Sequence, residues 1–369
     1  MESELTIVQR PGKLVSFQIK QGEGPGEWVS YPDHPLYASF IQSATFFTKI
    51  SSLVIFSWYF TVILTKRLIS YETIPAHLRK LDSVGAVWRF LKEALTRILR
   101  KIANSGWNHA DSVENPVRKA LVANGICVAK VDESCYSRIL DAAQPLFDQM
   151  QLARGERVGG GREFNESRGR ALRTAHAELF SAIEDFLEIS GVLNGISAYL
   201  GRPVKLVDVN PQINDVTDDF WRRVFPDSPS INIPTSYFHK DASGGDVKII
   251  FYMTDVGEEN GPFSYALGSN PKNYPKLIEW VEETNDQSGF SGTTVEARTR
   301  FSALPSILRK KAAFGNDVIA GSGVSQRILD STWEILAPQG HIVVFDTKGI
   351  HRGGLVENGE RRVITCITG

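Results

Sequence analysis

The segment Ser236-Tyr-Phe-His-Lys-Asp241 places a histidine and an aspartate one residue apart, at the end of an expected β-strand. Successive side chains of a strand point to opposite faces, so His239 and Asp241 share a face with Cα atoms roughly 6 to 7 Å apart. One metal ion about 2.1 Å from each ligand atom can then bridge the two side chains. The pattern alone is common, and it becomes informative with a third ligand.

A second segment, Gly340-His-Ile-Val-Val-Phe-Asp-Thr-Lys-Gly-Ile-His-Arg-Gly-Gly354, supplies that ligand as His351, which follows a strand. Two histidines and one carboxylate on one side of a metal leave three open positions, an arrangement associated with non-haem Fe(II) oxygenases. The open positions allow a bidentate cosubstrate and O₂ to bind one iron, which a closed four-ligand zinc site does not. The sequence therefore predicts His239, Asp241 and His351 as metal ligands and as the catalytic centre.

The last strand carries two arginines toward this centre. Asn358-Gly359 lies between two β-prone flanks, which is a strong hairpin signal, so residues 361–367 fold back beside the strand that leads to His351. An arginine at this place can pair bidentately with a carboxylate. Strand alternation puts Arg361 and Arg362 on opposite faces that are both partly apolar, so periodicity leaves the choice between them open.

Outward from these segments, the pattern predicts a mainly β fold with flanking helices. Turn-rich segments separate short β-type runs, as in an all-β barrel or jelly roll, at 125–131, 203–209, 231–239, 247–254, 341–346 and 361–367. Helical periodicity is expected over 113–123, 133–152 and 175–200. The strands stop at about 271–332, where helical stretches such as 275–283 and 305–313 indicate an insertion.

Taken together, the motifs resemble the phytanoyl-CoA dioxygenase-like family of Fe(II)/2-oxoglutarate oxygenases over roughly residues 112–369. The matching pieces recur in the family's order: His239-Lys-Asp241, Glu259-Asn-Gly-Pro-Phe263, Leu267-Gly-Ser-Asn270, Phe345-Asp346, His351-Arg-Gly-Gly354 and Gly359-Glu-Arg361. The resemblance implies a double-stranded β-helix, a cupin-like jelly roll, that binds Fe(II), 2-oxoglutarate and O₂. It also implies an arginine on the distal carboxylate of 2-oxoglutarate, and Arg361 matches that position best.

Two positions refine the reaction that the resemblance implies. Asn270 stands where the family often has a histidine, so a role for that histidine does not carry over. Related halogenases lack the carboxylate ligand, so the presence of Asp241 favours hydroxylation, desaturation or cyclisation. Asn210 and Gln212 lie on a preceding strand where family members often contact the cosubstrate.

Composition excludes several classes of protein. Hydrophobic residues make up 42% and charged residues 22%, which is typical of a globular chain. Basic and acidic residues number 41 and 42, and the net charge of −1 offers no global attraction to nucleic acid. Three cysteines without CxxC spacing indicate a reducing compartment, and the start Met-Glu-Ser-Glu lacks a secretory pattern, so a cytoplasmic location is expected.

Residues 1–110 form an expected extension to the oxygenase domain at 111–369. Within the extension, Ile50–Thr65 is free of charge and is bracketed by Lys49 and Lys66-Arg67, while 87–102 has the pattern of a basic amphipathic helix. One interpretation attaches residues 44–102 to a membrane, peripherally or as a span. The other has them pack against the barrel or a second subunit.

The substrate is expected to be a small molecule or lipid-like, because of the apolar extension. An arginine-rich stretch at 154–173 suggests an acidic group or a carrier-tethered thioester, although a mobile lid or a solvated connection explains that stretch as well. Two rival functions stay open: a zinc or cupin-like metalloenzyme that does not use 2-oxoglutarate, and a membrane-associated adaptor with a degenerate barrel.

Overall fold

The computed structural model describes most of the chain, in two compact units. The described residues are 5–8, 44–68, 85–86, 88–89, 91–92, 114–155, 169–215, 235, 237–241, 247–271, 276–292, 294–309, 313–315, 318, 322–354 and 356–369. The first unit, called the barrel unit below, comprises Met1–Ser39, Asp111–Tyr274 and Ala312–Gly369. The second, the helical unit, comprises Phe40–Ala110 and Pro275–Lys311.

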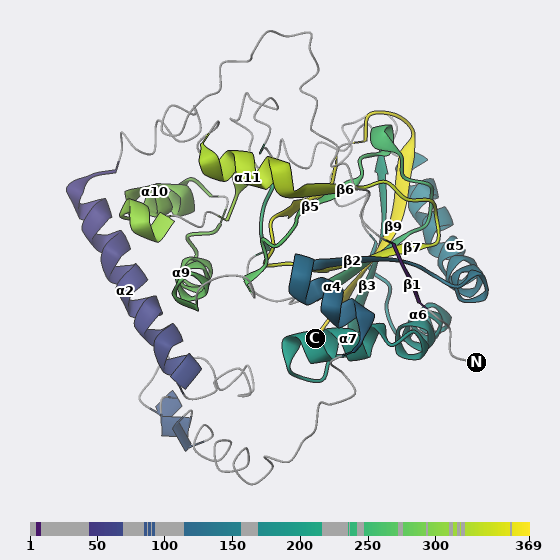
Figure 1. Ribbon diagram of the computed structural model, residues 1–369, viewed down its shortest axis with the longest axis horizontal. Coiled ribbons are helices and arrows are strands. Elements are labelled where there is room, and N and C mark those ends of the chain that lie inside the picture. Colours follow the sequence, from purple (N-terminus) through teal and green to yellow (C-terminus); the bar gives the residue numbers. More distant parts are fainter. Residues whose placement is uncertain are drawn as a thin grey trace. The chain divides into compact units, whose positions relative to one another are not determined.

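Two antiparallel sheets form the barrel unit (Figure 1). The larger sheet has the strand order β1 (Thr6–Ile7), β2 (Ile126–Lys130), β7 (His341–Asp346), β4 (Val247–Tyr252), β9 (Glu360–Thr368) and β3 (Leu206–Asp215). The smaller sheet has the order β6 (Thr332–Ile335), β5 (Phe263–Ala266) and β8 (His351–Arg352). The predicted mainly β jelly-roll core is confirmed.

Strand alternation gives the larger sheet two apolar faces. On β7, Val343 and Phe345 pack with residues of the smaller sheet, so this inner face lies between the two sheets. Ile342 and Val344 point the other way and pack against helices. Because both faces are covered, the strand is an unbroken apolar run instead of an alternation of polar and apolar residues.

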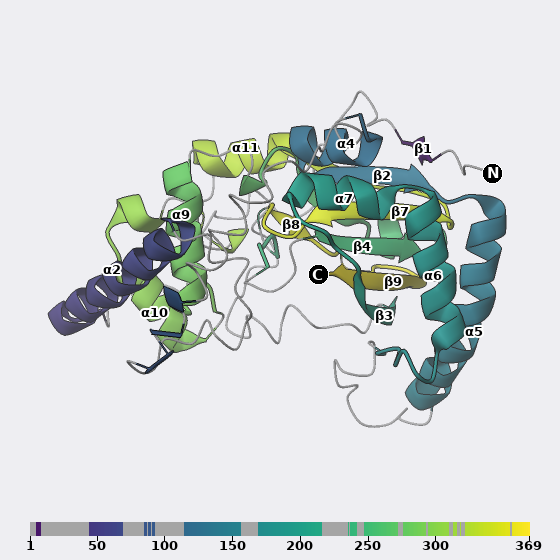
Figure 2. The same cartoon turned by 90° about the horizontal axis from the view of Figure 1, so that it is seen from below.

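Helices α4 (Pro116–Asn124), α5 (Glu133–Gly155), α6 (Ala177–Ile189) and α7 (Val192–Leu200) contribute to the core on the outer face of the larger sheet (Figure 2). The start of α4 follows from its sequence: the side chain of Asn115 accepts hydrogen bonds from two backbone N–H groups, and Pro116 occupies the first turn. Gly125 ends the helix at φ +79, where an added Cβ would lie 2.3 Å from the Tyr265 hydroxyl. The chain can therefore turn directly into β2.

Most predicted elements of the barrel unit are confirmed, but the strand expected at 231–239 is wrong within its described residues. Residues 235 and 237 lie in turns, and His239 makes only isolated β-bridges. Tyr237 has φ +67, which a strand does not accommodate. The sequence also missed β5, β6 and β8, which have four, four and two residues and are too short to show a period.

The helical unit contains α2 (Phe46–Leu68), α9 (Lys276–Gln287), α10 (Val295–Ala303) and a 3-10 turn at Ser306–Arg309. Helix α2 packs against α9 and α10, so segments more than 200 residues apart in sequence form one unit. The helix expected at 275–283 is confirmed as α9, whereas the described part of 305–313 has only the 3-10 turn. Helix α10, and α11 (Gly323–Ser331) in the barrel unit, were not predicted.

Two predicted segments fall largely outside the described residues. Of the expected helix at 87–102, residues 88–89 and 91–92 are described, and they are helical. Of the arginine-rich stretch at 154–173, residues 156–168 lie outside the described part of the chain.

Candidate metal centre

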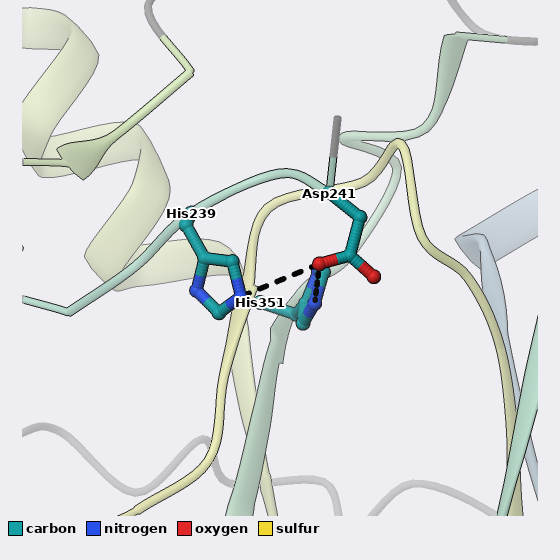
Figure 3. A group of neighbouring side chains, drawn as sticks. All are labelled: His239, Asp241 and His351. Carbon is teal, nitrogen blue, oxygen red and sulfur yellow. Dashed lines mark ion pairs between the residues drawn. The ribbon is translucent and has the colours of Figure 1, made fainter. Parts of the chain in front are cut away.

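The backbone brings the three predicted ligands to one place (Figure 3). His239 and His351 form an antiparallel bridge in which each backbone N–H donates to the other's carbonyl, at 2.9 Å in both directions. Such a hydrogen-bonded pair holds its two Cα atoms about 5.5 Å apart. Asp241 is fixed next to them because its N–H donates to the carbonyl of Thr347 at 2.9 Å.

The ligand atoms converge on a common point. One carboxylate oxygen of Asp241, Oδ1, lies 3.6 Å from Nε2 of His239 and 3.8 Å from Nε2 of His351. The three ligand atoms all lie within 4.8 Å of one another. Two neighbouring ligands, each about 2.1 Å from one ion, stand roughly 3 Å apart, so small side-chain rotations close this set around a metal.

Both imidazoles are held in the tautomer that a metal requires. Nδ1 of His239 donates to the carbonyl of Tyr237 at 3.1 Å, and Nδ1 of His351 donates to the carbonyl of Gly349 at 2.9 Å. A carbonyl only accepts, so the proton resides on Nδ1 and the Nε2 lone pair faces Asp241. Tyr237 has a positive φ, and in this backbone conformation its carbonyl accepts the hydrogen bond from Nδ1 of His239. The donor set therefore fits a divalent metal ion.

Burial and charge set the protonation states of the ligands. Burial, reinforced by the neighbouring His239, lowers the pKa of His351 to about 3, so this ring is neutral at pH 7. Burial would raise the pKa of Asp241, but the ammonium group of Lys248 beside Oδ2 holds that pKa well below its usual range. A carboxylate and a neutral imidazole are the forms that bind a metal.

Lys248 contacts one carboxylate oxygen of Asp241, and the other oxygen faces the two histidines. Its Nζ lies 2.5 Å from Oδ2 of Asp241, the oxygen that does not face the histidines. Lys248 was not predicted from the sequence. Its signal was a single cation in the apolar strand β4, where alternation gives it the same face as Ile250 and Tyr252.

A cavity of about 420 Å³ opens beside the ligands on the inner face of the larger sheet. Among the described residues that line it, Lys248 and Arg361 are cations, and Arg361 is 8% exposed. Its polar lining also includes Asn210 and Gln212, which the sequence pointed to, together with Asn214 from the same strand. Aromatic side chains line it as well, from Tyr252, Phe263 and Phe345.

The structure separates the two arginines that the sequence left open. Arg361 shares the inner face with Val363, and both line the cavity. Arg362 lies on the outer face: its Nε donates to Glu360 at 2.6 Å, and its guanidinium stands 5.9 Å from the ring centre of Phe147. Arg361 is thus placed to meet a ligand in the cavity, and Arg362 is not among the residues that line it.

Three further polar residues of the quoted motifs have structural partners. The carboxylate of Asp346 accepts from the hydroxyl of Tyr199 at 2.5 Å and from the N–H of Lys348 at 2.9 Å, as a loop cap does. Asn270 is fully buried and donates to the Tyr199 hydroxyl at 2.8 Å. His341 lies at the start of β7, with Nδ1 3.0 Å from the carbonyl of Pro338.

No protein-family model matches the chain, and no curated protein sequence matches it. Among solved structures, AviO1 from Streptomyces viridochromogenes Tue57 is 13% identical, with a TM-score of 0.38, over 69% of this chain and 93% of that one. HygX from Streptomyces hygroscopicus, solved with nickel and 2-oxoglutarate bound, is 14% identical, with a TM-score of 0.37, over 71% and 87%. EctD from S. alaskensis, solved with 2-oxoglutarate and 5-hydroxyectoine, is 9% identical, with a TM-score of 0.42, over 71% and 78%. At these values the site residues remain the basis for a functional proposal.

Proposed function

We propose that the chain is an Fe(II)- and 2-oxoglutarate-dependent oxygenase that oxidises an unactivated C–H bond of a small or lipid-like substrate. The observation that carries the proposal is one cavity lined by the two-histidine, one-carboxylate set and by a buried arginine, Arg361. The ligands suit non-haem iron with open positions. The arginine suits the distal carboxylate of a dicarboxylic cosubstrate.

His239 and His351 would hold the iron through Nε2, and Asp241 through Oδ1. Lys248 keeps Oδ2 of Asp241 engaged, so the carboxylate offers the metal one oxygen and not two. Single-oxygen ligation leaves three positions open, which is the number that a bidentate 2-oxo acid and O₂ need together. When bound, the iron supplies oxygen activation, and the protein supplies ligation and orientation.

Arg361 would anchor the far end of 2-oxoglutarate. Its side chain is almost fully buried, and a charge-assisted pair is stronger there than in water because the surroundings screen it less. Burial raises the pKa of Tyr252, which also lines the cavity, to about 12, so its phenol stays protonated and adds no competing negative charge. The aromatic lining helps to keep water from the reacting atoms.

For hydroxylation, substrate, O₂ and 2-oxoglutarate give the alcohol, succinate and CO₂, with one oxygen atom in the alcohol and the other in succinate. Asp241 occupies the ligand position that a halogenase leaves for chloride, which supports oxygen insertion over halogenation. Desaturation and cyclisation would use the same site, and the mass of their products, which lack two hydrogens, distinguishes both from hydroxylation. The six arginines of residues 154–173 support an acidic or carrier-tethered substrate.

The test follows succinate release from 2-oxoglutarate by the iron-loaded protein, alone and with pooled metabolites, with mass detection of oxidised products. His239→Ala and Asp241→Ala are expected to abolish succinate release, while His341→Ala, a histidine of the same unit that does not line the cavity, keeps it. Retained 2-oxoglutarate turnover in either ligand variant would overturn the metal assignment. Zinc-supported activity without 2-oxoglutarate would identify the rival metalloenzyme.

A further inference from the structure

Helix α2 is apolar on both of its faces. One face, with Ser52, Phe56 and Ile63, is buried, and the helix packs on α9 and α10. The opposite face carries large exposed apolar side chains at helical spacing, from Phe46, Phe47, Ile50, Val54 and Trp58. Phe47 is 81% exposed and Trp58 64%. A helix on the surface of a globular unit normally presents a polar outer face, so this one has the composition of a contact surface.

Length and composition alone would also let this helix cross a membrane. The stretch Phe46–Leu64 is long enough to span and has a mean hydropathy of 1.6. Within its most apolar 18-residue window, 17% is buried inside the protein. The packing against α9 argues for a different placement. Helix α9 carries four acidic residues, Glu279, Glu282, Glu283 and Asp286, and charged side chains are costly inside hydrocarbon. A helix that keeps α9 as its neighbour can lie along a bilayer surface with its outer face immersed.

Charge is distributed unevenly between the two units. The helical unit has sixteen lysines and arginines and eight aspartates and glutamates, a net charge of +8, in a chain whose total is −1. The barrel unit therefore carries −9. On α2 itself the charged residues are Lys49, Lys66 and Arg67, with no acidic residue. An anionic lipid surface attracts such a unit, by about 1 kcal/mol for each basic residue close to the membrane.

From the apolar outer face and the positive charge together, we propose that the helical unit binds an anionic lipid bilayer, with α2 parallel to the membrane plane and its outer face among the acyl chains. A second copy of the chain fits this face less well, because two helical units would bring like net charges together. The proposal is independent of the proposed function. It gives residues 275–311 a supporting role, because α9 and α10 pack against α2 in the helical unit while the exposed apolar face of α2 meets the lipid.

The test is flotation of the full-length protein with vesicles of phosphatidylcholine alone or of phosphatidylcholine and phosphatidylserine. We expect flotation with the anionic vesicles, and weaker flotation with neutral vesicles or in about 0.5 M salt, where charges are screened within a few ångströms. Phe47→Ser and Trp58→Ser each remove an exposed aromatic ring and are expected to lower vesicle binding roughly tenfold or more. Lys49→Glu should lower anionic binding without affecting neutral binding.

The matched control is Leu172→Ser, which removes a 56% exposed leucine from the barrel unit and is expected to float like the wild type. All four positions are exposed, so circular dichroism and thermal unfolding should be unchanged. The proposal is overturned if the wild-type protein stays with the soluble fraction, or if the Leu172 variant loses as much binding as the Phe47 variant. It is also overturned if sedimentation shows a dimer that Trp58→Ser dissociates while vesicles do not bind.

Discussion

Replacing Arg361 by alanine tests the cosubstrate half of the proposed site. The guanidinium lies in the cavity beside the metal ligands, is 8% exposed and donates to the Gly354 carbonyl at 3.4 Å, a long bond that a carboxylate can replace. A hydrogen bond to a charged group contributes about 1.5 to 3 kcal/mol. The dissociation constant of 2-oxoglutarate should therefore rise roughly 10- to 150-fold. Arg361→Lys keeps the positive charge but loses the planar guanidinium. Its dissociation constant for 2-oxoglutarate should therefore lie between those of the wild type and of Arg361→Ala.

The assay is titration of the anaerobic, metal-loaded protein with 2-oxoglutarate, with the metal content of each variant measured alongside. Arg362→Ala is the matched control, since the adjacent side chain points to the outer face and pairs with Glu360. We expect it to leave 2-oxoglutarate affinity within about twofold and to lower the free energy of unfolding by about 0.5 to 1 kcal/mol. Weakened cosubstrate binding in the Arg362 variant, with normal binding in the Arg361 variant, would refute the assignment.

Two further predictions concern the metal ligands. Lys248→Met frees Oδ2 of Asp241, and this second carboxylate oxygen can then take one of the open metal positions. The variant should still bind metal, but the affinity of the metal-loaded protein for 2-oxoglutarate should fall about tenfold. An unchanged affinity would contradict the role given to Lys248. The lowered pKa of His351, about 3 against about 6.5 unfolded, means that the unfolded chain binds more protons between these pH values. The free energy of unfolding of the metal-free protein should therefore fall by about 2 kcal/mol between pH 7 and pH 5 in urea titrations, and His351→Gln should lose most of that slope.

The sequence singled out the three side chains that converge in the structure because each stands in a short, recognisable segment. His239 and Asp241 are two residues apart, and His351 follows an apolar strand that shows clearly in the sequence. The strand expected to give His239 and Asp241 a shared face is nevertheless absent from the described residues of 231–239. A turn with Tyr237 at positive φ and a single bridge to His351 bring the side chains together, and a period-two pattern does not reveal either feature.

Other parts of the site depend on which face of a strand meets the cavity. Arg361 and Arg362 have equally apolar neighbours along β9, so only the packing of the larger sheet against helices on one side and the smaller sheet on the other decides between them. Lys248 was missed for the same reason. The helical unit was out of reach because its two segments are far apart in sequence, and helical periodicity does not reveal which helix a given face meets.

The most direct test of the metal centre is the absorption spectrum of the anaerobic protein with Fe(II) when 2-oxoglutarate is added. A 2-oxo acid that chelates iron at open positions gives a metal-to-ligand charge-transfer band in the visible region. We predict this band for the wild-type protein and for His341→Ala, and its loss in His239→Ala and Asp241→Ala. An iron-loaded wild-type protein without the band, or a band that survives in both ligand variants, would contradict the assignment of His239, Asp241 and His351 as a site for iron and 2-oxoglutarate.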